Sequence, residues 1–179
     1  MKHRLISPYK SFGYNENLAD SELSMNSREI KILAATPNFR DEIAHLLWVQ
    51  LQEHAISISE EKLQGAVDGV LENPARGALW VALKNERPVG VAYISYIWAM
   101  EHGGKSAWLE ELFVLPEFRE LGYGTLILDV VMQAVRASGC AAIDLEVEAG
   151  HGRVESLYSR NGFSKLSRSR WVKSMQENV

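Results

Sequence analysis

The sequence is poor in cysteine, with Cys140 the single one among 179 residues. A lone cysteine excludes an internal disulfide framework. Long apolar runs are also missing, because the longest, residues 89–100, is interrupted by Ser95 and is well short of the roughly 18 residues that a membrane-spanning helix needs. Residues 1–14 hold no apolar stretch typical of a secretory signal. We therefore expect a cytoplasmic protein that does not bind membranes.

An excess of positive charge is absent as well. The chain has 19 Lys and Arg against 23 Asp and Glu, a net charge of −4, which disfavours binding to a nucleic-acid backbone. With 46% hydrophobic residues, a chain of this length can bury one core. Residues 1–27 lack periodicity, so we expect an N-terminal tail or extension there, either peripheral or wrapped on the core or a partner, and one domain over residues 28–179.

Hydrophobic periodicity predicts an alternation of strands and helices along that domain. Alternating apolar residues indicate strands, and a 3.6-residue spacing indicates helices. A hairpin in the first half and strands alternating with helices in the second half favour a mixed α/β sheet. The expected strands cover residues 30–34, 78–83, 88–98, 107–115 and 143–147 and a last strand region that Phe163 opens and that includes 169–175. Of the expected helices, the first carries Ile43, Leu46, Leu47 and Leu51 on one face, the second runs from a cap at Ser57 or Ser59 to the break at Asn73-Pro74, and the last two lie near 124–137 and 152–160.

A glycine-rich loop over residues 114–125 joins a predicted strand to a predicted helix. Gly122 and Gly124 stand where the helix begins, so backbone N–H groups can converge there on an anion, aided by the helix dipole. The spacing of a P-loop is missing, and Ile127 stands where a dinucleotide fingerprint needs its third glycine. The loop predicts a phosphate cradle of another kind, the alternative being glycines that merely permit a tight turn.

Two elements resemble the GNAT superfamily of N-acetyltransferases. Residues 119–124, Arg-Glu-Leu-Gly-Tyr-Gly, match its Arg/Gln-x-x-Gly-x-Gly/Ala loop, and residues 157–163, Leu-Tyr-Ser-Arg-Asn-Gly-Phe, resemble its C-terminal Leu-Tyr-x-x-x-Gly-Phe element. Residues 112–116 look like the family's fourth strand. The resemblance implies an α/β (α+β) fold with a mixed, mostly antiparallel central sheet, helices on both faces and a splay between strands 4 and 5.

The same resemblance implies acetyl-CoA as the cosubstrate. Backbone amides of residues 121–125 would hold its pyrophosphate, and Phe113 and Val114 would pair with the pantetheine arm. His151 stands where the family often has an asparagine that touches the pantetheine, and it can still donate a hydrogen bond. The expected cofactor-binding residues are Phe113, Val114, Arg119, Leu121, Gly122, Tyr123, Gly124, Thr125 and His151.

Acetyl transfer to an amine needs a neutral nucleophile. An alkyl ammonium has a pKa near 10.4, so the enzyme must supply a base or a proton path. In similar family members an acidic residue corresponding to Glu110 draws the proton through water, and its neighbour, here Glu111, orients the amine. Strand alternation sends the two carboxylates to opposite faces unless a bulge intervenes. We expect Glu110 to be the proton acceptor, the alternative being two exposed strand carboxylates.

Tyr158 resembles the family's general acid, which protonates the leaving thiolate; the alternative is a half-buried packing tyrosine. The five histidines show no spacing suited to a metal site, so no metal is expected. The resulting prediction is direct acetyl transfer to a primary amine of a small or polyamine-like molecule. The alternatives are a protein N-terminal or lysine acetyltransferase and a non-catalytic regulatory module that binds acetyl-CoA. A homodimer is expected by analogy with such folds alone.

Overall fold

A computed structural model describes residues 30–148 and 152–175 of the chain. The chain divides into two compact units between Glu146 and Val147, and each unit is described by itself. The expected tail over residues 1–27 and the expected pantetheine contact His151 lie outside the described residues. No helix in the described ranges is both long enough and apolar enough to cross a membrane.

A five-stranded sheet forms the centre of the first unit, in the order β1-β2-β3-β4-β5. Neighbouring strands are antiparallel except for β4 and β5, which are parallel. This confirms the predicted mixed, mostly antiparallel sheet. The strands are β1 (Ile30–Ala34), β2 (Gly77–Lys84), β3 (Arg87–Ala99), β4 (Gly104–Val114) and β5 (Ile143–Leu145).

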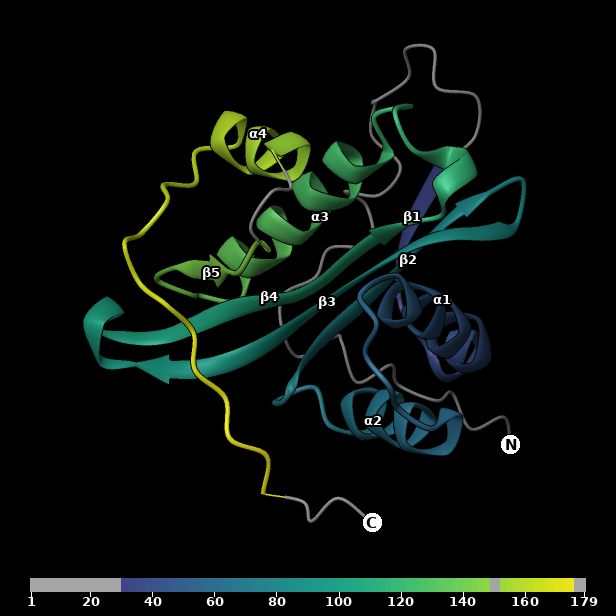
Figure 1. Ribbon diagram of the computed structural model, residues 1–179, viewed down its shortest axis with the longest axis horizontal. Helices are drawn as coiled ribbons and strands as arrows, with labels where there is room; N and C mark the ends of the chain where they lie inside the picture. Colours follow the sequence, from purple (N-terminus) through teal and green to yellow (C-terminus); the bar gives the residue numbers. More distant parts are fainter. Residues whose placement is uncertain (1–29, 149–151, 176–179) are drawn as a thin grey trace, which may run out of the picture. The chain divides into compact units, whose positions relative to one another are not determined.

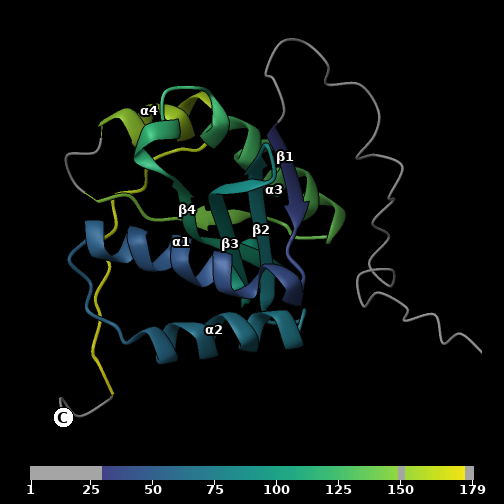
Figure 2. The ribbon, with the colours of Figure 1, turned by 90° about the vertical axis from the view of Figure 1, so that its right-hand side faces the viewer.

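Helices cover both faces of this sheet, as Figure 1 and Figure 2 show. One face packs against α1 (Arg40–Glu53) and α2 (Glu60–Glu72), and the other packs against α3 (Tyr123–Ala137). The core between the sheet and the first two helices includes Ile43, Leu46, Leu47, Leu63, Val67, Val81, Val91 and Phe113. Short 3-10 turns, η3 (Pro37–Phe39), η4 (Met100–His102) and η5 (Pro116–Phe118), connect the elements.

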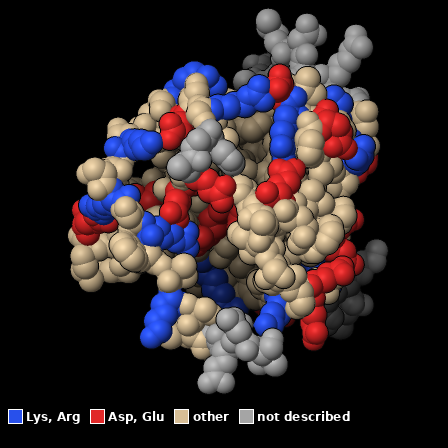
Figure 3. Space-filling view, viewed as in Figure 1, with Lys and Arg blue, Asp and Glu red and all other residues tan. Residues whose placement is uncertain are grey.

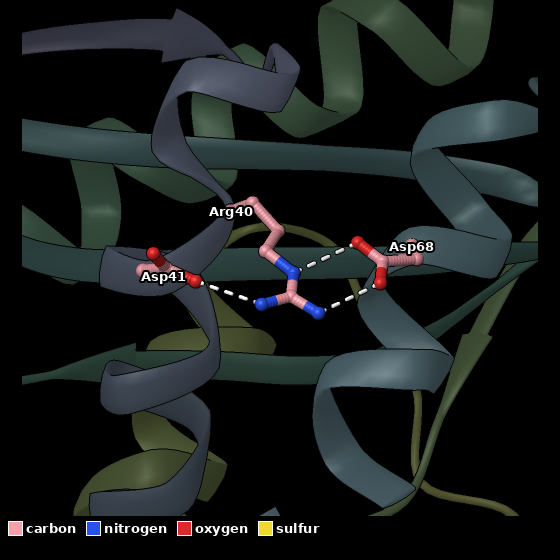
Figure 4. A network of polar contacts seen from close by, with 3 residues as sticks. All are labelled: Arg40, Asp41 and Asp68. Atoms are coloured by element: carbon pink, nitrogen blue, oxygen red, sulfur yellow. Dashed lines mark hydrogen bonds and ion pairs between the residues drawn. The ribbon is translucent and has the colours of Figure 1, made fainter. Parts of the chain in front are cut away.

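The two helices on the first face are bound to each other, and α2 is capped at its N-terminus. Ser59 caps α2, because its hydroxyl accepts a hydrogen bond from the backbone N–H of Lys62 at 3.3 Å. Arg40 at the start of α1 donates two hydrogen bonds to Asp68 of α2, at 2.9 and 2.8 Å, and a third to Asp41 (Figure 4). The guanidinium lowers the pKa of Asp68 by donating to its carboxylate. A bidentate pair of this kind fixes the relative register of the helices.

The second unit contains α4 (Gly152–Arg160), which ends as predicted at a left-handed glycine, Gly162, with φ of +84°. The strand region predicted from Phe163 through residues 169–175 is wrong, since residues 163–175 contain no strand. Trp171 and Val172 are 92% and 90% exposed. A strand needs a neighbour to satisfy its backbone groups, and the described part of this unit offers none.

Candidate active site

A β-bulge interrupts β4 at the predicted catalytic position. In the register with β3, Tyr93 lies opposite Glu111, and the next residue of β3, Ile94, lies opposite Leu109. Glu110 is therefore an extra residue with no counterpart across the ladder. An extra residue bends the strand and breaks the alternation of its side chains between the two faces.

The bulge brings both carboxylates to the face of the sheet that α1 and α2 cover. Glu111 Oε2 accepts a hydrogen bond from Gln50 Nε2 of α1 at 2.5 Å. Glu110 Oε1 accepts from Ser95 Oγ at 2.8 Å, and Ser95 follows Tyr93 by two residues along β3, so both point to one face. Tyr93 itself packs against the core beneath α1. The side-by-side arrangement that strict alternation would forbid is thus present.

The two carboxyl groups differ in environment. Burial raises the pKa of Glu111 to about 7, and the negative charge of Glu110 adds to the increase. The neighbouring His54 and the hydrogen bond from Gln50 act in the opposite direction. Glu110 is exposed. Near neutral pH, Glu111 is therefore divided between its acid and its carboxylate forms, which suits a group that receives a proton.

β4 and β5 part directly beside this pair. Their parallel pairing joins residues 107–109 to Ile143–Leu145 and goes no further along β4. From Glu110 to Val114, the edge of β4 that faces away from β3 has no strand partner in the described part of the unit. Phe113 and Val114, the residues expected to contact pantetheine, lie on this open stretch. An extended ligand can add to such an edge through main-chain hydrogen bonds.

The glycine-rich loop leads from the end of β4 through η5 to α3. Gly122, the N-cap of α3, has φ of +82°, a conformation that side chains rarely adopt. No side chain among the described residues caps this helix, and its first turn is closed by a bond from the Leu126 N–H to the Gly122 carbonyl at 3.2 Å. The N–H groups of Tyr123, Gly124 and Thr125 precede that bond and have no acceptor within the helix. They fit an anion such as a pyrophosphate.

The side chain of Arg119 is anchored to the protein rather than directed at a ligand. Arg119 donates from Nε to the Val114 carbonyl at 2.9 Å and from Nη2 to both oxygens of Glu53 at 2.9 and 2.7 Å. Its guanidinium also lies 5.4 Å from the centre of the Phe113 ring. Arg119 therefore ties the loop to the last turn of α1, and the backbone rather than this side chain is the stronger candidate for pyrophosphate contacts. Leu121 is exposed on the same loop.

Tyr123, the first residue of α3, anchors the end of the loop to β2. Its side chain is 4% exposed, and its hydroxyl accepts a hydrogen bond from Lys84 Nζ, at the end of β2, at 2.6 Å. The ring also stacks on Phe118 with centroids 6.5 Å apart. The start of α3 is thus held to the sheet by a buried aromatic residue.

The sequence-based reasoning missed Gln50, Ser95 and Lys84, all of which contact predicted site residues. Gln50 carried a usable signal, because it occupies the apolar face of α1, where Leu46 and Leu47 are buried. One polar residue on such a face indicates a buried partner. The other two stand on strands, where polar residues are common.

Tyr158 belongs to the second unit and is described apart from the residues above. It lies on α4 with its side chain buried, edge-on to the Phe163 ring at 5.4 Å between centroids. Figure 3 shows Lys and Arg interspersed with Asp and Glu on the face of the described residues that it presents. No group of three His, Cys, Asp or Glu in the described ranges is arranged to hold a metal ion.

Comparison with known proteins places these features in context. Residues 40–163 match the family model described as acetyltransferase (GNAT) family. Thialysine N-epsilon-acetyltransferase of Mus musculus is 29% identical over 122 residues, which are 65% of this chain and 71% of the relative.

Two solved structures share the fold. An integron cassette protein from the mobile metagenome of Cole Harbour Salt Marsh superposes with a TM-score of 0.73 at 22% identity, over 83% of this chain and 92% of that one. An aminoglycoside N-acetyltransferase in complex with CoA superposes with a TM-score of 0.72 at 16% identity, over 86% and 100%. At these identities the superpositions establish the fold alone.

Proposed function

The chain belongs to the acetyltransferase (GNAT) family, and from this premise we propose that it acetylates the primary amine of a small, positively charged molecule. As a member of that family it is an acetyl-CoA-dependent N-acetyltransferase. The observation that carries the choice of acceptor is the carboxylate pair on one face of β4, where Glu110 is exposed and Glu111 is half-buried. Two neighbouring carboxylates attract an ammonium group. The name of the mouse relative, which specifies an amine nitrogen, agrees with this class of acceptor.

Glu111 is the residue that we assign to proton removal. Deprotonating an alkyl ammonium at pH 7 costs about 4.6 kcal/mol, and a base with a pKa near the working pH removes the proton most effectively. The raised pKa of Glu111, about 7, meets that requirement. Glu110, held by Ser95, then orients the ammonium. These roles reverse the sequence-based expectation, and burial is the reason for the exchange.

The remaining residues bind the cosubstrate and complete the proton path. When bound, acetyl-CoA supplies the activated acetyl group. The N–H groups of Tyr123, Gly124 and Thr125 hold the pyrophosphate, and the open edge of β4 at Phe113 and Val114 hydrogen bonds to the pantetheine arm. The Tyr158 hydroxyl donates its proton to the departing thiolate sulfur. Transfer is direct, with no acetyl group on the enzyme.

The acceptor class is tested by thiol release from acetyl-CoA against a panel of acceptors. The panel contains diamines, thialysine and lysine, an aminoglycoside, and peptides with a free N-terminus or an internal lysine. We expect release with the small di- and polycationic amines and little release with peptides. Release with peptides alone would contradict the proposed acceptor and favour a protein acetyltransferase.

The roles of the two carboxylates are separated by Glu111→Gln and Glu110→Gln. Loss of the base in Glu111→Gln is expected to lower kcat/KM by roughly 10²–10⁴-fold. Glu110→Gln is expected to raise KM for the amine with a smaller change in kcat, because it removes an orienting charge. Steady-state kinetics from pH 6 to 9.5 measure both. A larger loss of kcat in Glu110→Gln than in Glu111→Gln would return the base to Glu110.

A further inference from the structure

Gln50 stands out on α1 because it is polar on a buried helix face. Its side chain is 8% exposed, and Ile43, Leu46 and Leu47 on the same helix belong to the hydrophobic core. A leucine or methionine at this position would continue that core. The amide therefore calls for an explanation beyond packing.

The amide of Gln50 is only half satisfied. Nε2 donates to Glu111 Oε2 at 2.5 Å, across 61 residues of sequence. Oε1 is fully buried and accepts no hydrogen bond from any described residue. An unsatisfied buried oxygen destabilises a fold, whereas an apolar side chain of the same shape carries no such penalty. Folding stability alone does not account for Gln50, and the hydrogen-bond partner of its side chain among the described residues is the proposed base.

Besides Gln50, the charged groups that act on Glu111 are Glu110 and His54. Glu110 lies beside Glu111 on β4, and His54 is the C-cap of α1, one turn after Gln50. Tyr93 lies opposite Glu111 on β3, and Ser95 donates a hydrogen bond to Glu110. Burial and Glu110 favour the protonated acid, whereas Gln50 and His54 favour the carboxylate. Gln50 is the group among these that bonds directly to the carboxylate of Glu111.

We propose that Gln50 is a positioning residue for acetyl transfer, which occupies Oε2 of Glu111, favours the carboxylate form of the group and leaves Oε1 as the oxygen that receives the proton from the amine. This inference rests on the proposed function, in which Glu111 is the base. A donor on one oxygen fixes the rotation of the carboxylate, so that the free oxygen is presented in one orientation. Gln50 itself touches neither substrate nor cosubstrate.

The test replaces the amide while keeping the shape of the side chain. Gln50→Met removes the donor, and Gln50→Asn keeps an amide but shortens its reach by one methylene group. Leu46→Met, one turn earlier on the same buried face, is the matched control for a change in packing. For both Gln50 variants we expect the acid limb of the kcat/KM profile to move up by about one pH unit. The rate at pH 6 would then fall about tenfold, and the rate at pH 9 less than twofold. Leu46→Met should leave the limb in place.

A second measurement does not depend on activity. In protein labelled with ¹³C at the glutamate carboxyl carbon, the Glu111 signal is identified by its absence in Glu111→Gln, and its titration is followed in each variant. An upward shift of its midpoint in Gln50→Met and Gln50→Asn supports the inference. An unchanged midpoint, or a loss of activity that is equal at all pH values, overturns it. If Gln50→Met fails to fold, Gln50→Asn decides.

The two proposals fail in different ways. If Glu111→Gln retains full activity, the base assignment fails, although the titration can still detect the Gln50 contact. If Glu111 is essential and the Gln50 variants keep both the wild-type limb and the wild-type midpoint, the positioning role alone is wrong.

Discussion

Glu111 ionises near neutral pH, and its partial burial makes the stability of the fold depend on pH. Its folded-state pKa of about 7 is above the ordinary value of 4.5 that the unfolded chain would have. A group with a raised folded pKa contributes its full share of stability below the unfolded value and loses that share as the pH rises through the folded value. The native protein is thus expected to lose stability between about pH 5 and pH 8.

Glu111→Gln removes that ionisation. We expect the variant to be more stable than the native protein at pH 9, by roughly 1–3 kcal/mol, because no charge is buried there. At pH 4.5 the two proteins should be nearly equal in stability. Urea unfolding at both pH values measures the difference. A gain of the same size at pH 4.5 and pH 9 would contradict the raised pKa.

Tyr158→Phe tests the proposed general acid. A thiolate is a tolerable leaving group, so removal of the phenol should slow turnover rather than abolish it, by roughly a hundredfold or more in kcat. The dissociation constant for acetyl-CoA, measured by calorimetry, should change little, because the ring and its edge-on contact with Phe163 are kept. An unchanged kcat would remove Tyr158 from the mechanism and leave it a packing residue.

Residues within one motif could be predicted from the sequence, whereas their distant partners could not. Glu110, Glu111 and the loop from Arg119 to Thr125 stand in contiguous stretches with a recognisable pattern. Gln50 and Lys84 contact them from 61 and 39 residues away. Such pairings depend on the register between a helix and the sheet, and a single sequence does not specify that register.

At the scale of elements, periodicity predicted most of the fold because most elements bury one face. β1, α1, α2, the β2–β3 hairpin and α3 lie where the apolar spacing placed them. β5 ends at Leu145, two residues earlier than predicted, and the region after Phe163 is not a strand. Alternation describes one face of a strand, but pairing requires a neighbour that alternation does not reveal.

The turn into α3 offers a test of the anion cradle. Gly122 has φ of +82° and open space where a Cβ would stand, so Gly122→Ala introduces backbone strain without a clash. We expect relaxation of that strain to move the first N–H groups of α3 and to weaken acetyl-CoA binding roughly 5- to 50-fold. Calorimetric titration measures the affinity.

Gly139, just beyond the other end of α3, is the matched control. Its φ is +74° and its surroundings are equally open. Gly139→Ala should lower the melting temperature to a similar extent while leaving acetyl-CoA affinity within about twofold. If both variants lose affinity equally, the effect reflects general destabilisation rather than the cradle.

At the scale of the whole molecule, the last turn of α1 contacts both the proposed base and the proposed pyrophosphate loop. Gln50 binds the proposed base on β4, and Glu53 binds Arg119 of the proposed pyrophosphate loop. One helix end therefore carries contacts to both the amine side and the cosubstrate side of the first unit. The fold class was predictable because the order of elements limits the possible topologies. This joint role of α1 was not.

Deletion of residues 1–27 tests the proposed division into an extension and a domain over 28–179. The family match begins at residue 40 and the first strand at Ile30, so the deletion removes no element of the described sheet. We expect the melting temperature to fall by no more than about 4 °C and both KM values to stay within twofold. A rise in KM for the amine alone would favour the alternative in which this segment wraps on the core.

The bulge in β4 bears on how such a site can arise or be lost. Because Glu110 is supernumerary in the ladder, its deletion would restore regular pairing and leave Glu111 as the single carboxylate of the pair, with every core residue of the strand still present. Conversely, two adjacent glutamates introduced by point substitution on an unbulged strand would point to opposite faces. The carboxylate pair that an amine would meet here therefore depends on the length of β4, by one residue, as much as on the identity of its residues.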